Sequence, residues 1–139
     1  MIVSSKGRYA VRAMIDLAQN GQEKPVSLTE VANRQQISQK YLEAVVRPLL
    51  RDGLVKSKMG KYGGYQLERK PKEYTLYEIL KTAEDTLESV SCEGMECSRS
   101  QGCITLPVWQ ELDSIIEDYF KKITLQEVLD GKVKKFYLK

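Results

Sequence analysis

The sequence predicts a mainly helical protein with one small β-hairpin and a long amphipathic helix near its C-terminus. Three observations support this fold class. Apolar residues recur at helical spacing in several segments, the longest of which covers residues 104–123. Residues 54–57 and 65–68 have the composition of short strands and enclose a glycine-rich tip. Serine and threonine capping signals precede several of the helical segments.

The first helix is expected over residues 4–19, where small and apolar side chains share one face. Its apolar stripe consists of Ala10, Ala13, Met14, Leu17 and Ala18. The alanines allow other helices to approach closely, and Asn20-Gly21 ends the segment because glycine readily leaves the helical conformation.

Residues 25–50 predict two short helices joined by a tight turn. Ser27 and Glu30 have the spacing of a capping box, in which each side chain accepts from the backbone N–H of the other. Gln35–Ile37 forms the turn, and Ser38 is positioned to cap the second helix. Pro48 lies within that second helix and predicts local loosening, because the apolar period continues past it. With the hairpin that follows, this is the outline of a winged helix-turn-helix, which places its second helix in the major groove of DNA.

The second helix leaves polar side chains on its outer face, and we call it the reader helix. Glutamine suits adenine, glutamate accepts from cytosine, and lysine suits guanine or a phosphate. In the hairpin, or wing, three glycines permit a tight tip that approaches phosphate closely. The candidate DNA-binding residues are Ser38, Gln39, Lys40, Tyr41, Glu43, Arg47, Lys58, Met59 and Lys61. The alternative is a generic helical domain with a solvated basic loop.

Charge divides the chain into two parts. Residues 1–72 contain 14 basic and 6 acidic residues, a net charge of +8, whereas residues 73–130 carry −9. A basic part of this kind is typical of phosphate binding. We therefore predict a DNA-binding domain over residues 1–72 and a second part over residues 73–139. No apolar run is long enough for a membrane helix and no signal peptide is evident, so we expect a cytoplasmic protein.

The long C-terminal helix is predicted to mediate dimerisation. Two further capping boxes, Thr75–Glu78 and Thr124–Glu127, mark shorter helices before and after this long helix. The apolar stripe of the long helix has heptad-like spacing. It is broader and more aromatic than a helix needs if it only covers the core of a small winged-helix domain. The residues of this stripe are Trp109, Leu112, Ile116, Tyr119 and Ile123. A homodimer would read a pseudo-palindromic operator on double-stranded DNA. The alternative for this stripe is packing within one chain.

All three cysteines of the protein lie within one dozen residues. Four residues separate Cys92 from Cys97, and five separate Cys97 from Cys103. Clustered thiols in a cytosolic protein favour iron–sulfur or soft-metal ligation over a structural disulfide. A 2Fe–2S cluster needs four ligands, and the chain contains no histidine. Local candidates for the fourth ligand are Glu93, Glu96, Ser98, Ser100 and Thr105. Zinc bound by three sulfurs, a metal-free thiol switch and three unliganded thiols are the alternatives.

These motifs together resemble the IscR, NsrR and CymR family of bacterial winged-helix regulators, and most of all its iron–sulfur member. The similarity covers Ser5–Ala10, Ile37–Glu43, Gly63–Tyr65, the three-cysteine loop and Ile123–Leu125. It implies a homodimeric transcription regulator that binds an iron–sulfur cluster through Cys92, Cys97 and Cys103. It also implies DNA contact by residues 38–43 and the wing, with a choice of operators that depends on cluster status.

Three positions depart from the family pattern. The family often has arginine where this chain has Met59, so minor-groove reading by the wing falls to Lys58 or Lys61. Leu106 occupies the position at which the iron–sulfur member has a histidine, three residues after the third cysteine. Arg8 occupies the position at which the member of the family that senses nitric oxide has an acidic cluster ligand. The chain offers no nucleophile–base arrangement, so we expect no enzyme. The alternative function is regulation of the same kind by thiol redox state, nitric oxide or cysteine-metabolism signals without a stable 2Fe–2S cluster.

Overall fold

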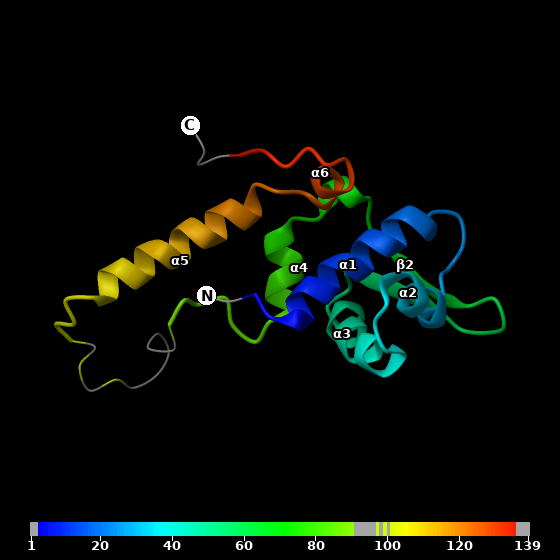
Figure 1. The fold of residues 1–139 in the computed structure, drawn as a ribbon, viewed down its shortest axis with the longest axis horizontal. Coiled ribbons are helices and arrows are strands. Elements are labelled where there is room, and N and C mark those ends of the chain that lie inside the picture. The colour runs from blue at the N-terminus through cyan, green and yellow to red at the C-terminus, as the bar shows by residue number, and fades with distance from the viewer. Residues whose placement is uncertain (1–2, 91–96, 98, 100, 136–139) are drawn as a thin grey trace.

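A computed structural model describes residues 3–90, 97, 99 and 101–135 of the chain (Figure 1). It consists of a helical body that carries a two-stranded hairpin, and of a long helix that leaves this body. The elements in chain order are α1 (Ser5–Asn20), α2 (Leu28–Gln35), α3 (Gln39–Arg51), β1 (Val55–Lys58), β2 (Gly64–Leu67), the 3-10 helix η1 (Pro71–Glu73), α4 (Leu76–Ala83), α5 (Leu106–Lys121) and α6 (Leu125–Leu129). The predicted fold class is confirmed, and the bounds of most predicted elements differ by one or two residues.

The centre of the body is α1, which packs against α2, α3, α4, α6 and β2. Ser4 caps this helix, because its hydroxyl accepts from the backbone N–H of Gly7 at 3.3 Å. The small residues Ala10 and Ala13 are almost fully buried and let the neighbouring helices approach. The small side chains along α1 thus help several elements to pack on this one helix.

The helix-turn-helix forms as the sequence predicts. Ser27 and Glu30 make a complete capping box at the start of α2, and Ser38 caps α3 by accepting from the Tyr41 N–H at 3.2 Å. Gln36 ends α2 in the left-handed conformation, with φ of 55°. The α3 helix continues through Pro48 without a break, and its buried face fills the core with Leu42, Val45, Val46 and Leu49.

A buried carboxylate joins α1 to α2, and the sequence analysis did not predict it. Asp16 is 1% exposed. Its two carboxylate oxygens accept from Arg34 Nε at 3.0 Å and from Arg34 Nη2 at 2.8 Å. Gln35 Nε2 donates to the same carboxylate at 2.9 Å. A charge this buried is tolerated because charged and polar donors replace its lost water.

The hairpin pairs antiparallel, with Val55 opposite Leu67 and Lys58 opposite Gly64. Its second strand also pairs with Val26, the residue that precedes the cap of α2. The Val26 N–H donates to the Tyr65 carbonyl at 3.0 Å, and the Tyr65 N–H donates to the Val26 carbonyl at 2.8 Å. The wing is therefore attached to the start of the helix-turn-helix by backbone hydrogen bonds.

The body extends past residue 72, the boundary predicted from the charge pattern. Tyr74, Ile79 and Leu125 are buried in the same core as α1. Two backbone hydrogen bonds bridge the segments around Thr75 and Thr124: the Leu76 N–H donates to the Ile123 carbonyl at 2.9 Å, and the Leu125 N–H donates to the Tyr74 carbonyl at 3.0 Å. The start of α6 is thus held against the helical body.

Of the two predicted capping boxes in this region, only the one at α6 is complete. Thr124 and Glu127 form it as predicted. Thr75 accepts from the Glu78 N–H at 3.2 Å. The Glu78 carboxylate, however, pairs with Arg69, which lies shortly after β2 in the chain. A charged partner nearby outcompetes the backbone N–H as a donor to this carboxylate.

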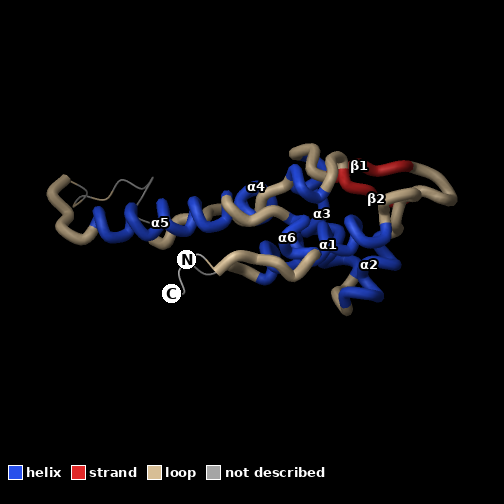
Figure 2. The backbone as a smooth tube through the Cα atoms, turned by 90° about the horizontal axis from the view of Figure 1, so that it is seen from above, coloured by secondary structure: helices blue, strands red, loops and turns tan. Residues whose placement is uncertain are grey.

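The long helix α5 projects away from the body in both views (Figures 1 and 2). None of its residues is buried. Ile123 departs from the predicted dimer stripe, because it lies two residues beyond the end of α5 and is only 2% exposed. Its side chain packs within the body, where the chain has left the helix to pair with Leu76.

No helix within residues 3–90, 97, 99 and 101–135 combines the length and the apolar character that a membrane span requires.

Replacing Asp16 by alanine is expected to destabilise the fold by about 2 kcal/mol. Breaking a fully buried ion pair costs about 3–5 kcal/mol, and the loss is smaller here because Arg34 is 39% exposed. Urea unfolding at fixed protein concentration measures this difference. The control is Asp52→Ala, which removes an exposed pair with Arg51 and should leave the midpoint unchanged. Equal effects of both substitutions would contradict the structural role of Asp16.

Candidate DNA interface and cysteine loop

The first turns of α3 form an exposed polar surface at one edge of the body. Ser38, Gln39, Lys40, Glu43 and Arg47 are all exposed. Their exposure leaves these hydrogen-bonding and charged groups available to a duplex, as a reader helix requires.

Tyr41 differs from the other predicted DNA-binding residues on α3, because its ring packs against α1. The ring lies edge-on to that of Tyr9, with 5.5 Å between centroids. Arg12 covers the other ring of this pair, with its guanidinium carbon 5.3 Å from the Tyr9 centroid. Arg12 Nε also donates to Gln35 Oε1 at 3.1 Å. Tyr41 therefore fixes α3 against α1, and only part of its side chain remains exposed.

Thr29 contacts the reader helix and was absent from the predicted interface. Its hydroxyl donates to Gln39 Oε1 at 3.2 Å. Both residues are exposed, and they come from neighbouring helices. The sequence gives no signal for this contact, since the two positions are ten residues apart in the chain and the turn lies between them.

The tip of the wing exposes apolar as well as basic side chains. Met59 is 91% exposed and Tyr62 is 82% exposed. Lys61 lies beside Tyr62, with its ammonium 5.6 Å from the ring centroid, and Lys58 is exposed at the end of β1. Tyr62 was not predicted as a site residue, although an aromatic residue between lysine and glycine in a tip is a recognisable signal.

Two glycines at the wing are required by close backbone contacts. A Cβ atom at Gly63 would lie 2.0 Å from the Lys58 carbonyl oxygen, and one at Gly64 would lie 2.4 Å from the Val26 carbonyl oxygen. Gly64 also has φ of 154°. Any side chain at Gly64 would therefore separate the wing from the segment that precedes α2.

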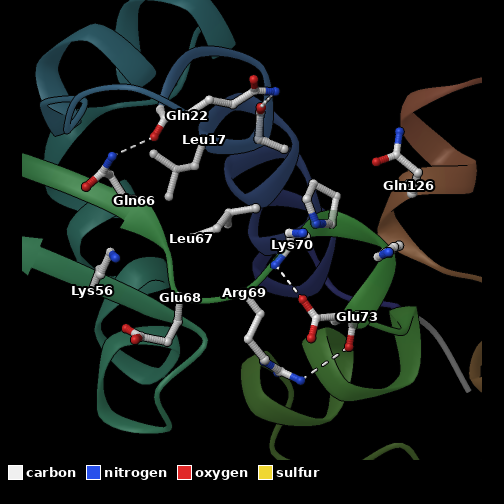
Figure 3. A pocket seen from close by; sticks show the side chains of 14 residues that line it. Leu17, Gln22, Lys56, Gln66, Leu67, Glu68, Arg69, Lys70, Glu73 and Gln126 are labelled. Atoms are coloured by element: carbon white, nitrogen blue, oxygen red, sulfur yellow. Dashed lines mark hydrogen bonds between the residues drawn. The ribbon is translucent and has the colours of Figure 1, made fainter.

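A cleft of about 810 Å³ lies between the end of α1, the base of the wing and η1 (Figure 3). Polar groups that line it are paired with one another. Gln66 Nε2 donates to the Gly21 carbonyl at 2.8 Å, Arg69 Nη1 donates to the Glu73 carbonyl at 3.2 Å, and the Lys70 N–H donates to Glu73 Oε2 at 2.9 Å. These bonds connect the wing to α1 and η1.

The cysteine loop precedes α5, at the end of this helix that lies farthest from the body (Figure 1). Cys97 and Cys103 are half-buried free thiols. Cys92 lies outside the described residues, as do Glu93, Glu96, Ser98 and Ser100. Among the residues that are described, no three cysteine, histidine, aspartate or glutamate side chains gather into a metal-binding group.

Cys103 lies in an environment that favours its thiolate. Its sulfur is 3.4 Å from the Thr105 hydroxyl oxygen. The hydrogen bond of this hydroxyl, followed by those of the backbone N–H groups of Thr105 and Leu106, lowers the pKa of Cys103. Thr105, a predicted fourth-ligand candidate, is thus next to one of the three thiols.

Hydrogen bonds hold the loop segment that leads to Cys92 at two places. The Ser89 N–H donates to Asp113 Oδ1 of α5 at 2.6 Å. At the end of α4, Glu84 accepts from the backbone N–H of Ser4 at 2.9 Å and from its hydroxyl at 2.8 Å. A Cβ at Gly7 would lie 2.2 Å from Glu84 Oε1, so glycine is needed for this approach. The segment therefore connects the start of α1 with the middle of α5.

The contact between α4 and α5 is partly polar, and it leaves apolar side chains of α5 uncovered. The Tyr77 ring on α4 lies near two ammonium groups, 5.4 Å from Lys81 and 4.8 Å from Lys121. The exposed apolar residues on α5 are Val108 at 57%, Leu112 at 37% and Ile115 at 42%. Trp109, Ile116 and Tyr119 of the predicted stripe are only half-exposed.

The reader helix is exposed, it precedes a wing with a glycine-rich tip, and it packs on a helical body. These features define a winged helix-turn-helix protein, a fold typical of DNA-binding transcription regulators. Comparison with known families agrees. The family model Rrf2, described as an iron-dependent transcriptional regulator, matches residues 3–131. The chain belongs to this family.

Similar proteins include transcription regulators named IscR and CymR. The HTH-type transcriptional regulator IscR of Pectobacterium carotovorum is 38% identical over 133 residues, which are 95% of this chain and 81% of that protein. The structure of T. potens IscR is 35% identical, with a TM-score of 0.73, and the match covers 99% of this chain and 95% of that one. The structure of CymR, the global cysteine regulator of B. subtilis, is 31% identical with a TM-score of 0.76, covering 94% and 98%. The relatives are named as regulators and not as enzymes, as the sequence predicted.

Gly64→Ala is expected to cost about 1–3 kcal/mol of stability, because it combines an unfavourable φ with a clash against backbone. Urea unfolding measures the loss. Gly53→Ala is the matched control, since Gly53 also has a positive φ, of 75°, but nothing lies within 4 Å of its Cβ position. A loss for Gly64→Ala no larger than that for Gly53→Ala would show that the close approach to Val26 is unimportant.

Proposed function

We propose that this protein is a homodimeric transcription regulator that reports iron–sulfur cluster status through Cys92, Cys97 and Cys103. The observation that carries the proposal is the position of the cysteine loop. It joins α4, which packs on the DNA-binding body, to α5, which exposes an apolar face. A ligand bound there would act on both parts of the molecule.

The chemistry of the donor set fits an iron–sulfur cluster. Thiolates are the ligands that such clusters prefer, and the hydrogen bonds around Cys103 favour its thiolate form. Cys92, Cys97 and Cys103 would hold the cluster, which is proposed to be of the 2Fe–2S type. Because the chain has no histidine, the fourth ligand is an oxygen donor, a backbone or external group, or a residue of the second chain.

DNA binding is proposed to use the first turns of α3 and the tip of the wing. The exposed side chains of α3 would enter the major groove, while Lys58, Met59 and Lys61 would meet phosphates or the minor groove. Tyr62 joins this set because it is 82% exposed at the same tip. Arg47 is exposed on α3 and would contact the phosphate backbone.

Dimerisation is proposed to occur through α5, with Trp109, Leu112, Ile116 and Tyr119 from the predicted stripe. The helix has no buried residue within its own chain, and it exposes Val108 and Ile115 along the same surface. An apolar stripe on a projecting helix is costly in water and is covered when two copies pair. The dimer would place two reader helices on the half-sites of a pseudo-palindromic operator.

Cluster binding is proposed to act on DNA binding through the two ends of the loop segment. Its hydrogen bonds attach it to Ser4 at the start of α1 and to Asp113 on α5. A cluster would restrict the cysteine loop that follows these attachments and favour one arrangement of the two reader helices. It can do so only if it binds more tightly to that arrangement than to others.

One alternative is favoured by a specific finding. The structural similarity to CymR, described as a global cysteine regulator, supports a regulator that responds to thiol redox state or cysteine metabolism without a stable 2Fe–2S cluster. In that case the loop would act through its thiols, or through zinc bound by them. Colour distinguishes the two functions, since neither thiols nor zinc absorb visible light.

Protein purified without oxygen is expected to be coloured and to contain iron and sulfide in cluster ratio. Cys92→Ala, Cys97→Ala and Cys103→Ala should each lose this absorption, because thiolates supply three of the four ligands. Visible spectra and iron and sulfide analysis measure this, with circular dichroism as the test that each variant is folded.

A matched control is Ser57→Ala, an exposed substitution on β1 that should keep the colour. Wild-type protein that is colourless and takes up no cluster from iron and sulfide would overturn the cluster proposal. Redox-dependent DNA binding by such colourless protein would support the alternative.

The double variant Leu112→Glu, Ile115→Glu is expected to be monomeric in sedimentation experiments, because two carboxylates would have to be buried in the α5 pairing. The control is Val133→Glu, which introduces a carboxylate at an exposed apolar residue outside α5 and should remain dimeric. A double variant that stays dimeric would place the interface elsewhere.

A further inference from the structure

The predicted DNA-reading surface contains a hydrogen bond between two exposed side chains of different helices. Thr29 is the second residue of α2, and Gln39 is the first residue of α3. The Thr29 hydroxyl donates to Gln39 Oε1 at 3.2 Å. An exposed hydrogen bond of this kind adds little to stability, because water offers both groups equivalent partners. The main consequence of this hydrogen bond is that it orients the side-chain amide of Gln39.

The backbone on which Gln39 stands is fixed independently of this contact. Ser38 caps the helix by accepting from the Tyr41 N–H, and Ile37 before it is only 8% exposed. Tyr41 is held edge-on against Tyr9. Three neighbouring residues thus fix the start of α3, and the remaining freedom of Gln39 lies in its own long side chain.

The Thr29 contact leaves Gln39 with the groups that adenine needs. A hydroxyl has one proton, so Thr29 has none left to donate to a phosphate while it bonds to Gln39. The amide oxygen of Gln39 keeps its second lone pair, and its NH₂ group keeps both protons. Adenine in the major groove offers the N6 amino group as donor and N7 as acceptor, which matches this amide in both bonds.

We propose that Thr29 is a positioning residue that holds the Gln39 amide for bidentate reading of one adenine in each half-site of the operator. This inference rests on the proposed DNA interface of α3. Without the Thr29 hydroxyl, Gln39 samples several rotamers and both orientations of its amide. The amide then presents donor and acceptor to the base in either order, so adenine loses its advantage over the other bases.

The experiment is the enrichment of a randomised duplex library by the purified full chain. The position read by Gln39 is the one whose preference disappears in Gln39→Ala. Thr29→Val, which keeps the shape and removes the donor, is expected to lower the adenine preference there by about 2- to 12-fold, the value of one hydrogen bond. Preferences at the other positions and affinity for non-specific DNA stay unchanged. Thr29→Ser keeps the hydroxyl and should keep the preference.

Combining the substitutions separates positioning from direct contact. In the Gln39→Ala background, Thr29→Val is expected to change nothing further. An effect that persists in this background would mean that Thr29 itself touches DNA, which overturns the inference. So would a base other than adenine at the Gln39 position, or equal preferences for wild type and Thr29→Val. A wild-type protein that enriches no sequence would instead refute the DNA-reading function on which the inference rests.

Discussion

The packing around α1 is the constraint on which the other elements depend. This helix touches α2, α3, α4, α6 and β2, so it can carry only small side chains where its neighbours come closest. Gly7, Ala10 and Ala13 meet that requirement. Its one buried carboxylate, Asp16, is matched by donors from α2, while α3 packs on it through apolar and aromatic contacts. Polar contacts therefore hold α2 on α1, and apolar and aromatic contacts hold α3 on it.

Two chemically different surfaces lie at opposite ends of this arrangement. The reader helix and the wing carry exposed basic and amide side chains, and the wing is attached to the start of the motif by the backbone of Val26 and Tyr65. The cysteine loop and α5 lie on the other side of α4 and belong to the acidic part of the sequence. Among the described residues, polar contacts at Glu84, Asp113 and Tyr77 help to connect them. Such contacts can break and re-form at lower cost than a packed core, which suits a joint between the proposed sensing and DNA-binding parts.

Features that depend on neighbours in the sequence were predictable, and those that depend on distant residues were not. Apolar periodicity and capping residues identified the helix-turn-helix, the wing and the last helix, because these signals are local. The Asp16 to Arg34 pair and the Thr75 to Thr124 bridge join residues far apart in the chain, and nothing in either segment alone indicates its partner. Ile123 shows the same limit, since it continues the helical period of α5 in the sequence although the helix ends before it. The exposure of the residues at the start of α3 was predictable from the helical period, whereas the contact between Thr29 and Gln39 required the folded arrangement.

The backbone bridge between Thr75 and Thr124 has a consequence for how this architecture can vary. After α4, which packs in the core, the chain leaves the body, and it returns beside the start of α4 at Thr124, so the residues between α4 and Thr124 form an excursion that begins and ends on the body. Excursions of this kind tolerate insertion, deletion and replacement, because the anchoring points do not move when the part between them changes. The body can therefore keep the geometry of its helix-turn-helix while the residues of the excursion change. Structures as differently named as IscR and CymR are both similar to this chain, as an architecture with a replaceable excursion would allow.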